Sequence, residues 1–270
     1  MLTLILSELR VVETIAGSRG NQAKYLYNGN WVKTDFLGYE GLAEVIACRL
    51  AKALDIPCVE YRPCRIITPR WSLNGCISED YAKGSAEASL GLILDNTMPR
   101  DFSVTSLKTT RDRVEAVCKA AERLMPREEL LDYLNTMLTF DSIIFNEDRH
   151  FYNIIFLVNE DGTLRRAPLF DNGAGLLSDQ MMDYGMSMPL LTCINKVKAK
   201  PFSTDFRKQV SYLNSICGDP FEGISSVTIH TSDLYDYYPA DHVSRALAAL
   251  RLGLENRGIG LSVISRETTE

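Results

Sequence analysis

The pattern of apolar and polar positions changes along the chain, and its first third predicts strands around one helix. Runs of strand character, rich in β-branched and aromatic residues, cover residues 10–15, 25–34, 58–67 and 75–81. The second of these runs is a hairpin with an Asn-Gly turn. Over residues 39–54, apolar side chains recur with helical spacing at positions 42, 43, 46, 47, 50, 51 and 54. The pattern therefore predicts one main helix, with one buried face, inside a strand-rich region.

From about residue 84 the pattern becomes helical. Amphipathic segments that predict helices follow at residues 111–124, 127–145, 204–213 and 241–256. Residues 174–200 have no strong period and predict a loop with short helix. The predicted fold class is α+β with two lobes, a small β-rich N-lobe over residues 1–82 and a larger α-helical C-lobe over residues 83–270.

Composition and charge restrict the class of protein. The chain has 270 residues, 46% of them hydrophobic, which is enough for a substantial core. Its net charge is −6 and it has no basic run, so we expect no direct binding of nucleic acid. The seven cysteines show no Cys-x-x-Cys pairing and predict reduced thiols of a cytoplasmic protein. The apolar opening is interrupted by Glu8 and is too short to cross a membrane, so we expect a first strand there and no membrane contact.

One short stretch carries the most chemical information. Asp148 and Asn153 stand five positions apart, the offset between the catalytic base and a metal-binding amide in protein kinases. A predicted hairpin follows, with strands over 154–157 and 163–170, and it returns Asp171 to the neighbourhood of the first two residues. Two carboxylates and one amide form a hard oxygen site suited to Mg²⁺ that bridges nucleotide phosphates. The stretch therefore predicts phosphoryl transfer, with Asn153 and Asp171 as metal ligands.

The predicted catalytic loop contains one candidate catalytic aspartate and two residues that we expect to position it. Asp148 is the candidate to accept the hydroxyl proton of the phosphoryl acceptor, or to orient that hydroxyl. An aspartate that caps a helix is the alternative, but it gives no reason for Asn153 and Asp171. Arg149 and His150 are predicted to position the loop or to offset its negative charge. The three histidines of the chain have no metal-ligand spacing, so we assign His150 a structural role.

A lysine and a helix carboxylate complete the kinase requirement. Lys33 ends a predicted strand just upstream of the helix that carries Glu40 and Glu44. A kinase needs a strand lysine on the nucleotide phosphates and a helix carboxylate that holds this lysine. We choose Glu44, which lies a full turn into the helix, because a carboxylate at Glu40 near the N-terminus also favours the helix dipole. Taken alone, these residues are better explained as an exposed lysine and two solvated helix glutamates, and it is Asp148, Asn153 and Asp171 in the same chain order that favour the functional interpretation.

The segment from Gly17 to Lys24 is predicted to cover the nucleotide. It is not a Walker loop, because no Gly-Lys-Ser or Gly-Lys-Thr ends it. Backbone N–H groups exposed by Gly17 and Gly20 can still cover phosphates, and the segment lies between two predicted strands, ahead of Lys33.

Together these motifs resemble the HipA-like serine/threonine kinases of bacteria, a divergent branch of the protein-kinase-like fold. The matching segments stand in family order along most of the chain. They are the Ser-x-Gly-x-Gln-x-Lys loop at 18–24, the lysine strand and helix at 31–44, the catalytic loop at 146–153 and the Ala-Pro-x-Tyr-Asp-like segment at 167–171. The last two are specific as a pair.

The resemblance implies a bilobal kinase-like fold, ATP and Mg²⁺ as cofactors, and transfer of the γ-phosphoryl group to a serine or threonine of a protein substrate. It also implies that Ser18, Gln22 and Lys24 belong to the nucleotide-covering loop. Ser18 is then an autophosphorylation site whose phosphate draws the loop away from the nucleotide and switches the kinase off. Arg19 replaces a glycine often seen in this loop, which predicts an altered nucleotide affinity.

Longer toxin-type members have an additional N-terminal domain, and we expect no counterpart because little sequence precedes Arg10. We therefore expect a separate antitoxin or regulatory protein as partner, or a stand-alone kinase or secreted effector. Two other functions stay open. A small-molecule phosphotransferase of aminoglycoside type shares the catalytic logic, and the charge of −6 permits a cationic acceptor. A nucleotide-binding pseudokinase is the third reading, although a scaffold has no need of Lys33, Asp148, Asn153 and Asp171 together.

Overall fold

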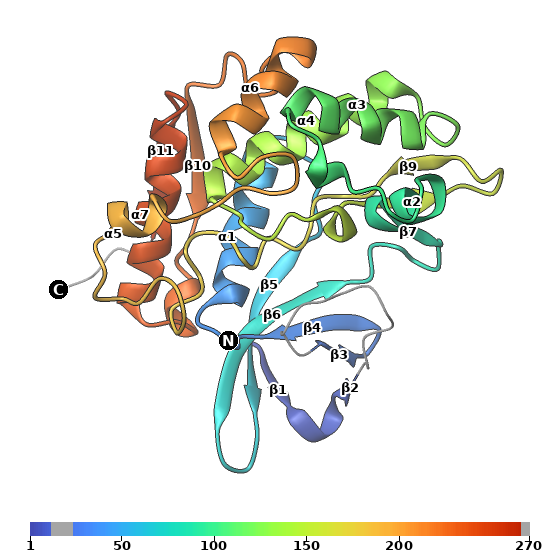
Figure 1. Cartoon of the computed structure of the whole chain (residues 1–270). Coiled ribbons are helices and arrows are strands. Elements are labelled where there is room, and N and C mark those ends of the chain that lie inside the picture. Colours follow the sequence, from blue (N-terminus) through green and yellow to red (C-terminus); the bar gives the residue numbers. More distant parts are fainter. Residues whose placement is uncertain (12–23, 266–270) are drawn as a thin grey trace.

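The computed structural model describes residues 1–11 and 24–265, and its N-terminal part is built on a six-stranded sheet (Figure 1). The strands lie in the order β1-β5-β6-β4-β3-β2. Their bounds are β1 (Thr3–Ile5), β2 (Arg10–Val11), β3 (Lys24–Tyr27), β4 (Asn30–Thr34), β5 (Tyr61–Ile67) and β6 (Ser72–Glu79). Neighbouring strands are antiparallel, except that β1 runs parallel to β5. The strand expected over 10–15 is present as β2, and the rest of that range lies outside the described residues.

The hairpin of β3 and β4 forms where the sequence predicted it. Asn28 and Gly29 both have positive φ, 49° and 78°, as a two-residue turn of type I′ requires. The turn sets a register in which Lys24 lies opposite Lys33, so both side chains point to the same face of the sheet.

Helix α1 (Glu40–Ala53) lies between this sheet and the C-terminal part of the molecule (Figure 1). It contacts β4, β5 and β6 on one side and β10 and α7 on the other. The sequence predicted one buried face, but the helix is buried almost all round because both parts of the molecule cover it. Gly41 makes the close packing possible. A Cβ there would lie 2.7 Å from the carbonyl carbon of Gly75 and 2.8 Å from the hydroxyl of Tyr238.

Helices dominate the chain after β6. They are α2 (Leu90–Thr97), α3 (Thr110–Ala121), α4 (Arg127–Ile144), α5 (Leu190–Ile194), α6 (Phe206–Cys217) and α7 (Ala240–Glu255). Short 3₁₀ helices among the described residues are η1 (Leu6–Glu8), η2 (Val104–Ser106), η3 (Phe151–Asn153) and η4 (Leu234–Asp236). The long helices expected near 111–124, 127–145, 204–213 and 241–256 correspond to α3, α4, α6 and α7, with small differences at their ends. No helix in residues 1–11 and 24–265 is long and apolar enough to span a membrane.

Two small sheets accompany the helices. One has the order β7 (Glu87–Ser89), β8 (Ile155–Val158) and β9 (Leu164–Arg166), and the other is a parallel pair of β10 (Ser226–His230) and β11 (Gly260–Ile264). The return strand expected over 163–170 is wrong in length. It ends at Arg166 because Pro168 follows shortly and has no N–H for a strand ladder. The sequence did not predict β10 and β11.

One large apolar core runs from α1 through the helical part, and a second, smaller cluster lies within the N-terminal sheet. The second cluster is formed by Leu4, Leu9, Val32, Cys64, Ile66 and Ile77. The α+β class with a β-rich N-terminal part and a helical C-terminal part is confirmed. The chain passes between the two parts through residues 80–86, and the boundary placed at residue 82 stays a prediction.

Candidate active site

Lys33 lies where three separate parts of the chain meet. It belongs to β4, and its Nζ donates to Oε1 of Glu44 on α1 at 2.5 Å and to Oδ1 of Asp171 at 2.8 Å. Its side chain is 9% exposed and that of Glu44 is fully buried, whereas that of Asp171 is 27% exposed. The ammonium group is thus held from the inside by Glu44, and its contact with Asp171 lies toward solvent.

The two carboxylates keep this lysine charged. Burial alone would lower the pKa of Lys33, but Asp171 and Glu44 outweigh burial and hold that pKa well above its ordinary value. Burial likewise would raise the pKa of Asp171, but Lys33 and Lys24 reverse the direction and lower it. Lys33 and Asp171 are therefore both ionised at neutral pH, as a phosphate-binding cation and a metal-binding anion must be.

The two glutamates of α1 have different contacts. Glu44 uses its second oxygen, Oε2, to accept the backbone N–H of Asn172 at 2.8 Å, so it connects Lys33 to the segment that follows β9. Glu40 instead accepts the backbone N–H groups of the residues that lead into the helix, Phe36, Leu37 and Gly38. It therefore satisfies backbone donors of the turn that leads into the helix. Of the two candidates, Glu44 is the one in contact with Lys33.

The predicted nucleotide-covering loop is described only at its end. Lys24 lies beside Lys33 on the sheet, and burial lowers its pKa although Asp171 works in the opposite direction. Gly17, Ser18, Gly20 and Gln22 lie outside the described residues. Lys24 therefore provides a second cation on the face of the sheet that carries Lys33.

The loop after α4 brings Asp148 and Asn153 together. The helix ends at Ile144, and Phe145 after it has the left-handed conformation, φ 55°, which turns the chain sharply. Asn153 lies in η3, and its Nδ2 donates to the backbone carbonyl of Asp148 at 2.9 Å. The Asp148 carboxylate itself is 43% exposed. The loop thus presents this acid at the surface and fixes the amide behind it.

Arg149 holds the loop from within the core. It is 0% exposed, and its guanidinium pairs with Asp141 of α4 through Nε at 2.9 Å and Nη2 at 3.2 Å. The same guanidinium donates to the carbonyls of Asn153 and Phe170 and to Oδ1 of Asn172. Burial alone would lower the pKa of Arg149, but Asp141 outweighs it and raises that pKa. One side chain therefore joins the loop of Asn153 to the segment of Asp171.

Asp171 has a backbone conformation that side chains other than glycine rarely adopt, with φ 60°. Its neighbours hold it there, because Arg149 binds the preceding carbonyl and Glu44 binds the following N–H. Strained backbone maintained by buried partners is typical of functional sites.

Asn153 and Asp171 fit a magnesium ion. Residues 1–11 and 24–265 contain no group of three or more His, Cys, Asp or Glu side chains arranged for a metal. Mg²⁺ needs no such group, since it is commonly bound by one or two protein oxygens together with substrate phosphates and water. Because the Nδ2 of Asn153 donates to the Asp148 carbonyl, the Oδ1 of Asn153 points away from that carbonyl. The donor set suits a hard cation that arrives with a nucleotide.

Sequence reasoning missed three residues of this region. Asp141 lies inside a helix and has no motif of its own. A carboxylate on the buried face of a helix nevertheless indicates a buried counter-charge, because charged side chains are rarely buried unpaired. Asn172 has no motif of its own, yet its backbone N–H donates to Glu44 and its Oδ1 accepts a hydrogen bond from Arg149. Lys200 contacts Asp148 from a segment without any periodic signal.

The β-rich part and the helical part, with a lysine and two carboxylates between them, have the organisation of a kinase-like fold. Among solved structures, the Helicobacter pylori proinflammatory kinase CtkA has this fold, with a TM-score of 0.64 and 14% identity over 94% of this chain and 95% of that chain. The likeness to CtkA confirms the expected kinase-like fold.

Two further solved structures are more distant. Shewanella oneidensis HipA, in a complex with HipB and operator DNA, has a TM-score of 0.43 and 14% identity, covering 93% of this chain and 73% of that chain. Hydra Fam20 with sugar has a TM-score of 0.41 and 12% identity, covering 96% and 90%. No protein-family model and no curated protein matches the sequence.

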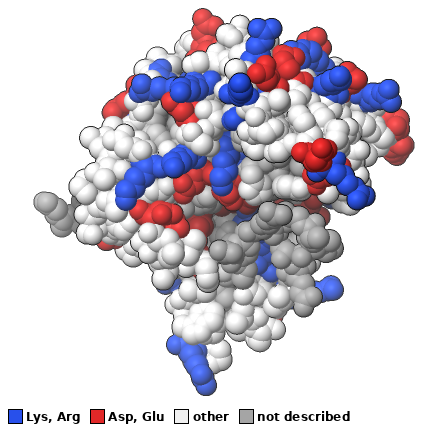
Figure 2. Space-filling model, viewed as in Figure 1, with Lys and Arg blue, Asp and Glu red and all other residues white. Residues whose placement is uncertain are grey.

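The charged surface is mixed rather than basic. Figure 2 shows Lys and Arg interspersed with Asp and Glu on the face in view, most of them over the helical part. Such a surface, on a chain of net charge −6, has no extended basic stripe on this face for a nucleic-acid backbone. Each of the seven cysteines is a free thiol.

Proposed function

We propose that this protein is an ATP- and Mg²⁺-dependent serine/threonine protein kinase of the HipA-like type. The observation that carries the proposal is the meeting of Lys33 with Glu44 and Asp171 at 2.5 and 2.8 Å. A kinase requires a lysine for the nucleotide phosphates, a helix carboxylate to hold that lysine and an aspartate for the metal. The kinase-like fold shared with CtkA supports this assignment.

Each group has a distinct task in the proposed reaction. Asn153 and Asp171 would hold Mg²⁺, which would neutralise charge that develops on the phosphate oxygens. Lys33 and Lys24 bind nucleotide phosphates from the sheet, and Glu44 keeps Lys33 in place. Arg149 fixes the distance between the loop of Asn153 and the segment of Asp171.

Asp148 acts on the acceptor. Its carboxylate is 43% exposed, so a serine or threonine hydroxyl of another protein can reach it. The carboxylate accepts the hydroxyl proton while the hydroxyl oxygen forms a bond to the γ-phosphorus. The bond from that phosphorus to the bridging oxygen breaks, and ADP leaves.

Phosphate incorporation from radiolabelled ATP tests the proposal, with and without a generic protein acceptor. Wild type is compared with Asp148→Asn and with Asp101→Asn, which removes an exposed carboxylate in the loop after α2. We expect labelled protein in wild type and Asp101→Asn, and loss of the label in Asp148→Asn. Mg²⁺-dependent ATP binding without protein labelling would contradict the proposal, and a screen of small acceptors would then separate a small-molecule phosphotransferase from a pseudokinase.

The proposal extends to control of the enzyme. The motif at Ser18 supports autophosphorylation there, and the HipA structure contains HipB, which supports a search for a separate antitoxin or regulatory protein. Mass spectrometry after incubation with ATP tests the first point, with Ser18→Ala as control. Absence of phosphate at Ser18 in an active enzyme would overturn it.

A further inference from the structure

Lys200 reaches the carboxylate of Asp148 from a distant part of the chain. It lies in the segment between α5 and α6, 52 positions after Asp148, and its Nζ donates to Oδ1 at 3.0 Å. Both side chains are half-exposed, so the contact lies at the surface of the protein. An exposed ion pair contributes little to the stability of the fold. The main effect of this pair is therefore on the position of the Asp148 carboxylate.

The catalytic loop does not supply an equivalent cation to Asp148. Arg149 is the loop's own arginine, but its guanidinium is buried against Asp141 and the carbonyls behind the loop. Among the described side chains, the ion pairs of Asp148 are with Lys200 at 3.0 Å and with Nε2 of His150 at 3.9 Å. Lys200 is thus the nearer of the two partners.

A buried glutamine fixes the backbone that carries Lys200. Gln209 of α6 is 0% exposed, and its Nε2 donates to the carbonyl of Lys200 at 3.0 Å. Its Oε1 accepts the backbone N–H groups of Phe202 at 2.9 Å and Ser203 at 3.3 Å. These bonds use the backbone of residues 200–203, so they do not depend on the Lys200 side chain.

The same segment is also joined to the catalytic loop. The ring of Phe202 is fully buried and meets the ring of Phe151 in η3 nearly edge-on, with centroids 5.5 Å apart. Arg113 of α3 donates to the carbonyl of Phe202 at 2.8 Å. The segment is therefore held against the loop that carries Asp148, which keeps the backbone of Lys200 next to that loop.

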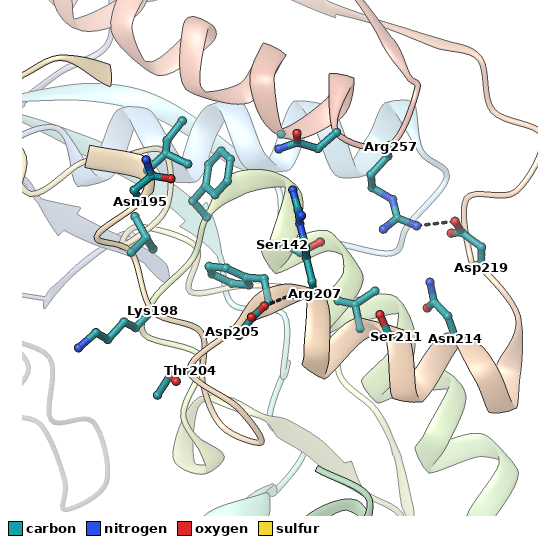
Figure 3. A pocket seen from close by; sticks show the side chains of 17 residues that line it. Ser142, Asn195, Lys198, Thr204, Asp205, Arg207, Ser211, Asn214, Asp219 and Arg257 are labelled. Atoms are coloured by element: carbon teal, nitrogen blue, oxygen red, sulfur yellow. Dashed lines mark hydrogen bonds and ion pairs between the residues drawn. The ribbon is translucent and has the colours of Figure 1, made fainter. Parts of the chain in front are cut away.

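A cavity of about 930 Å³ lies beside this segment (Figure 3). It is lined by α6, by the ends of α4 and α7, and by Ile194, Asn195, Val197 and Lys198. In Figure 3 the side chain of Lys198 points away from the other labelled polar side chains. Lys198 is exposed, and it has no ion pair among the described residues. It lies two positions from Lys200 in the same segment and is a matched control.

We propose that Lys200 is a positioning residue for Asp148, holding the carboxylate oriented for the acceptor hydroxyl with a cation that the catalytic loop itself lacks. The proposal rests on the proposed phosphoryl-transfer function and adds a residue from the segment between α5 and α6 to it. Since Lys200 acts through Asp148, its loss affects the transfer step and leaves nucleotide binding intact.

The test compares Lys200→Ala, Lys200→Arg and Lys198→Ala in steady-state phosphorylation and in Mg²⁺-ATP binding. We expect Lys200→Ala to lower kcat about 10-fold or more, with the KM and Kd for ATP within about 2-fold of wild type. Lys200→Arg should recover most of the loss, and Lys198→Ala should behave as wild type. Thermal melting should be unchanged in all three, because the anchoring bonds of the segment are to its backbone.

Several outcomes would overturn the proposal. An unchanged kcat in Lys200→Ala would show that Asp148 needs no partner, and a raised kcat would show that Lys200 blocks the acid. An equal loss in Lys198→Ala would assign the effect to the segment as a whole. A wild type that transfers no phosphate would overturn the proposed function and this role together, whereas an active wild type with an unaffected Lys200→Ala would overturn this role alone.

Discussion

Arg149 and Asp141 form an ion pair that is closed off from solvent, with side chains 0% and 1% exposed. The pair lies under the catalytic loop, and Arg149 alone reaches from α4 to the carbonyls of Asn153 and Phe170. Its geometry therefore decides where the loop of Asp148 and Asn153 stands relative to the segment of Asp171.

Removal of the guanidinium should destabilise the whole protein. Arg149→Met leaves the Asp141 carboxylate buried without a counter-charge, which should lower the free energy of unfolding by about 3–5 kcal/mol. Denaturant titration measures the change, with Arg251→Met on the exposed face of α7 as control. A loss as small as that of the control would contradict a structural role for the pair.

The two glutamates of α1 should respond differently to the same substitution. Glu44→Gln removes the charge that holds Lys33, so phosphate transfer should fall by at least about 10-fold. Glu40→Gln weakens bonds to N–H groups at the helix start and should lower the free energy of unfolding by about 0.5–2 kcal/mol, with transfer nearly unchanged. Equal effects of both variants on transfer would remove the distinction.

The magnesium requirement should depend on Asn153. Asn153→Ala deletes a proposed ligand and a bond to the Asp148 carbonyl, so the Mg²⁺ concentration for half-maximal transfer should rise about 10-fold or more. Asn159→Ala, in the exposed turn between β8 and β9, should leave that concentration as in wild type. If Asn153→Ala had the Mg²⁺ dependence of wild type, Asn153 would not be a metal ligand.

Asp35 should make stability depend on pH. Burial raises the pKa of this carboxyl to about 7, although a bond from the backbone N–H of Gly41 opposes the shift. Because the folded pKa is above the unfolded one, the group favours the folded state at low pH, and this contribution is lost as the pH rises from about 4 through 7. Between pH 5 and pH 8 the loss should be roughly 2–3 kcal/mol.

Asp35→Asn isolates this effect, since the amide keeps an oxygen for the Gly41 N–H and cannot titrate. Unfolding by denaturant at pH 5 and pH 8 should show a smaller decline in the variant than in wild type. Parallel declines in both proteins would assign the pH dependence to other groups.

Local elements of the fold could be read from the order of residues because their causes are local. The Asn28-Gly29 turn, the periodic apolar positions of α1 and the length of α4 each depend on side chains a few positions apart. Elements that need distant partners were missed. The parallel strands β10 and β11 are separated in the chain by a helix, and the pattern of their few residues does not predict that they pair.

For the site, the sequence by itself determined which chemical groups are present and in what order, from Lys33 and Glu44 to Asp148, Asn153 and Asp171. Fixed offsets within one loop or one helix turn made these residues recognisable. Only the tertiary structure decided which groups touch. Asp141 with Arg149, Asn172 with Glu44 and Lys200 with Asp148 are contacts set by the path of the chain through a packed core. Such contacts join segments far apart in sequence, and no local periodicity encodes them.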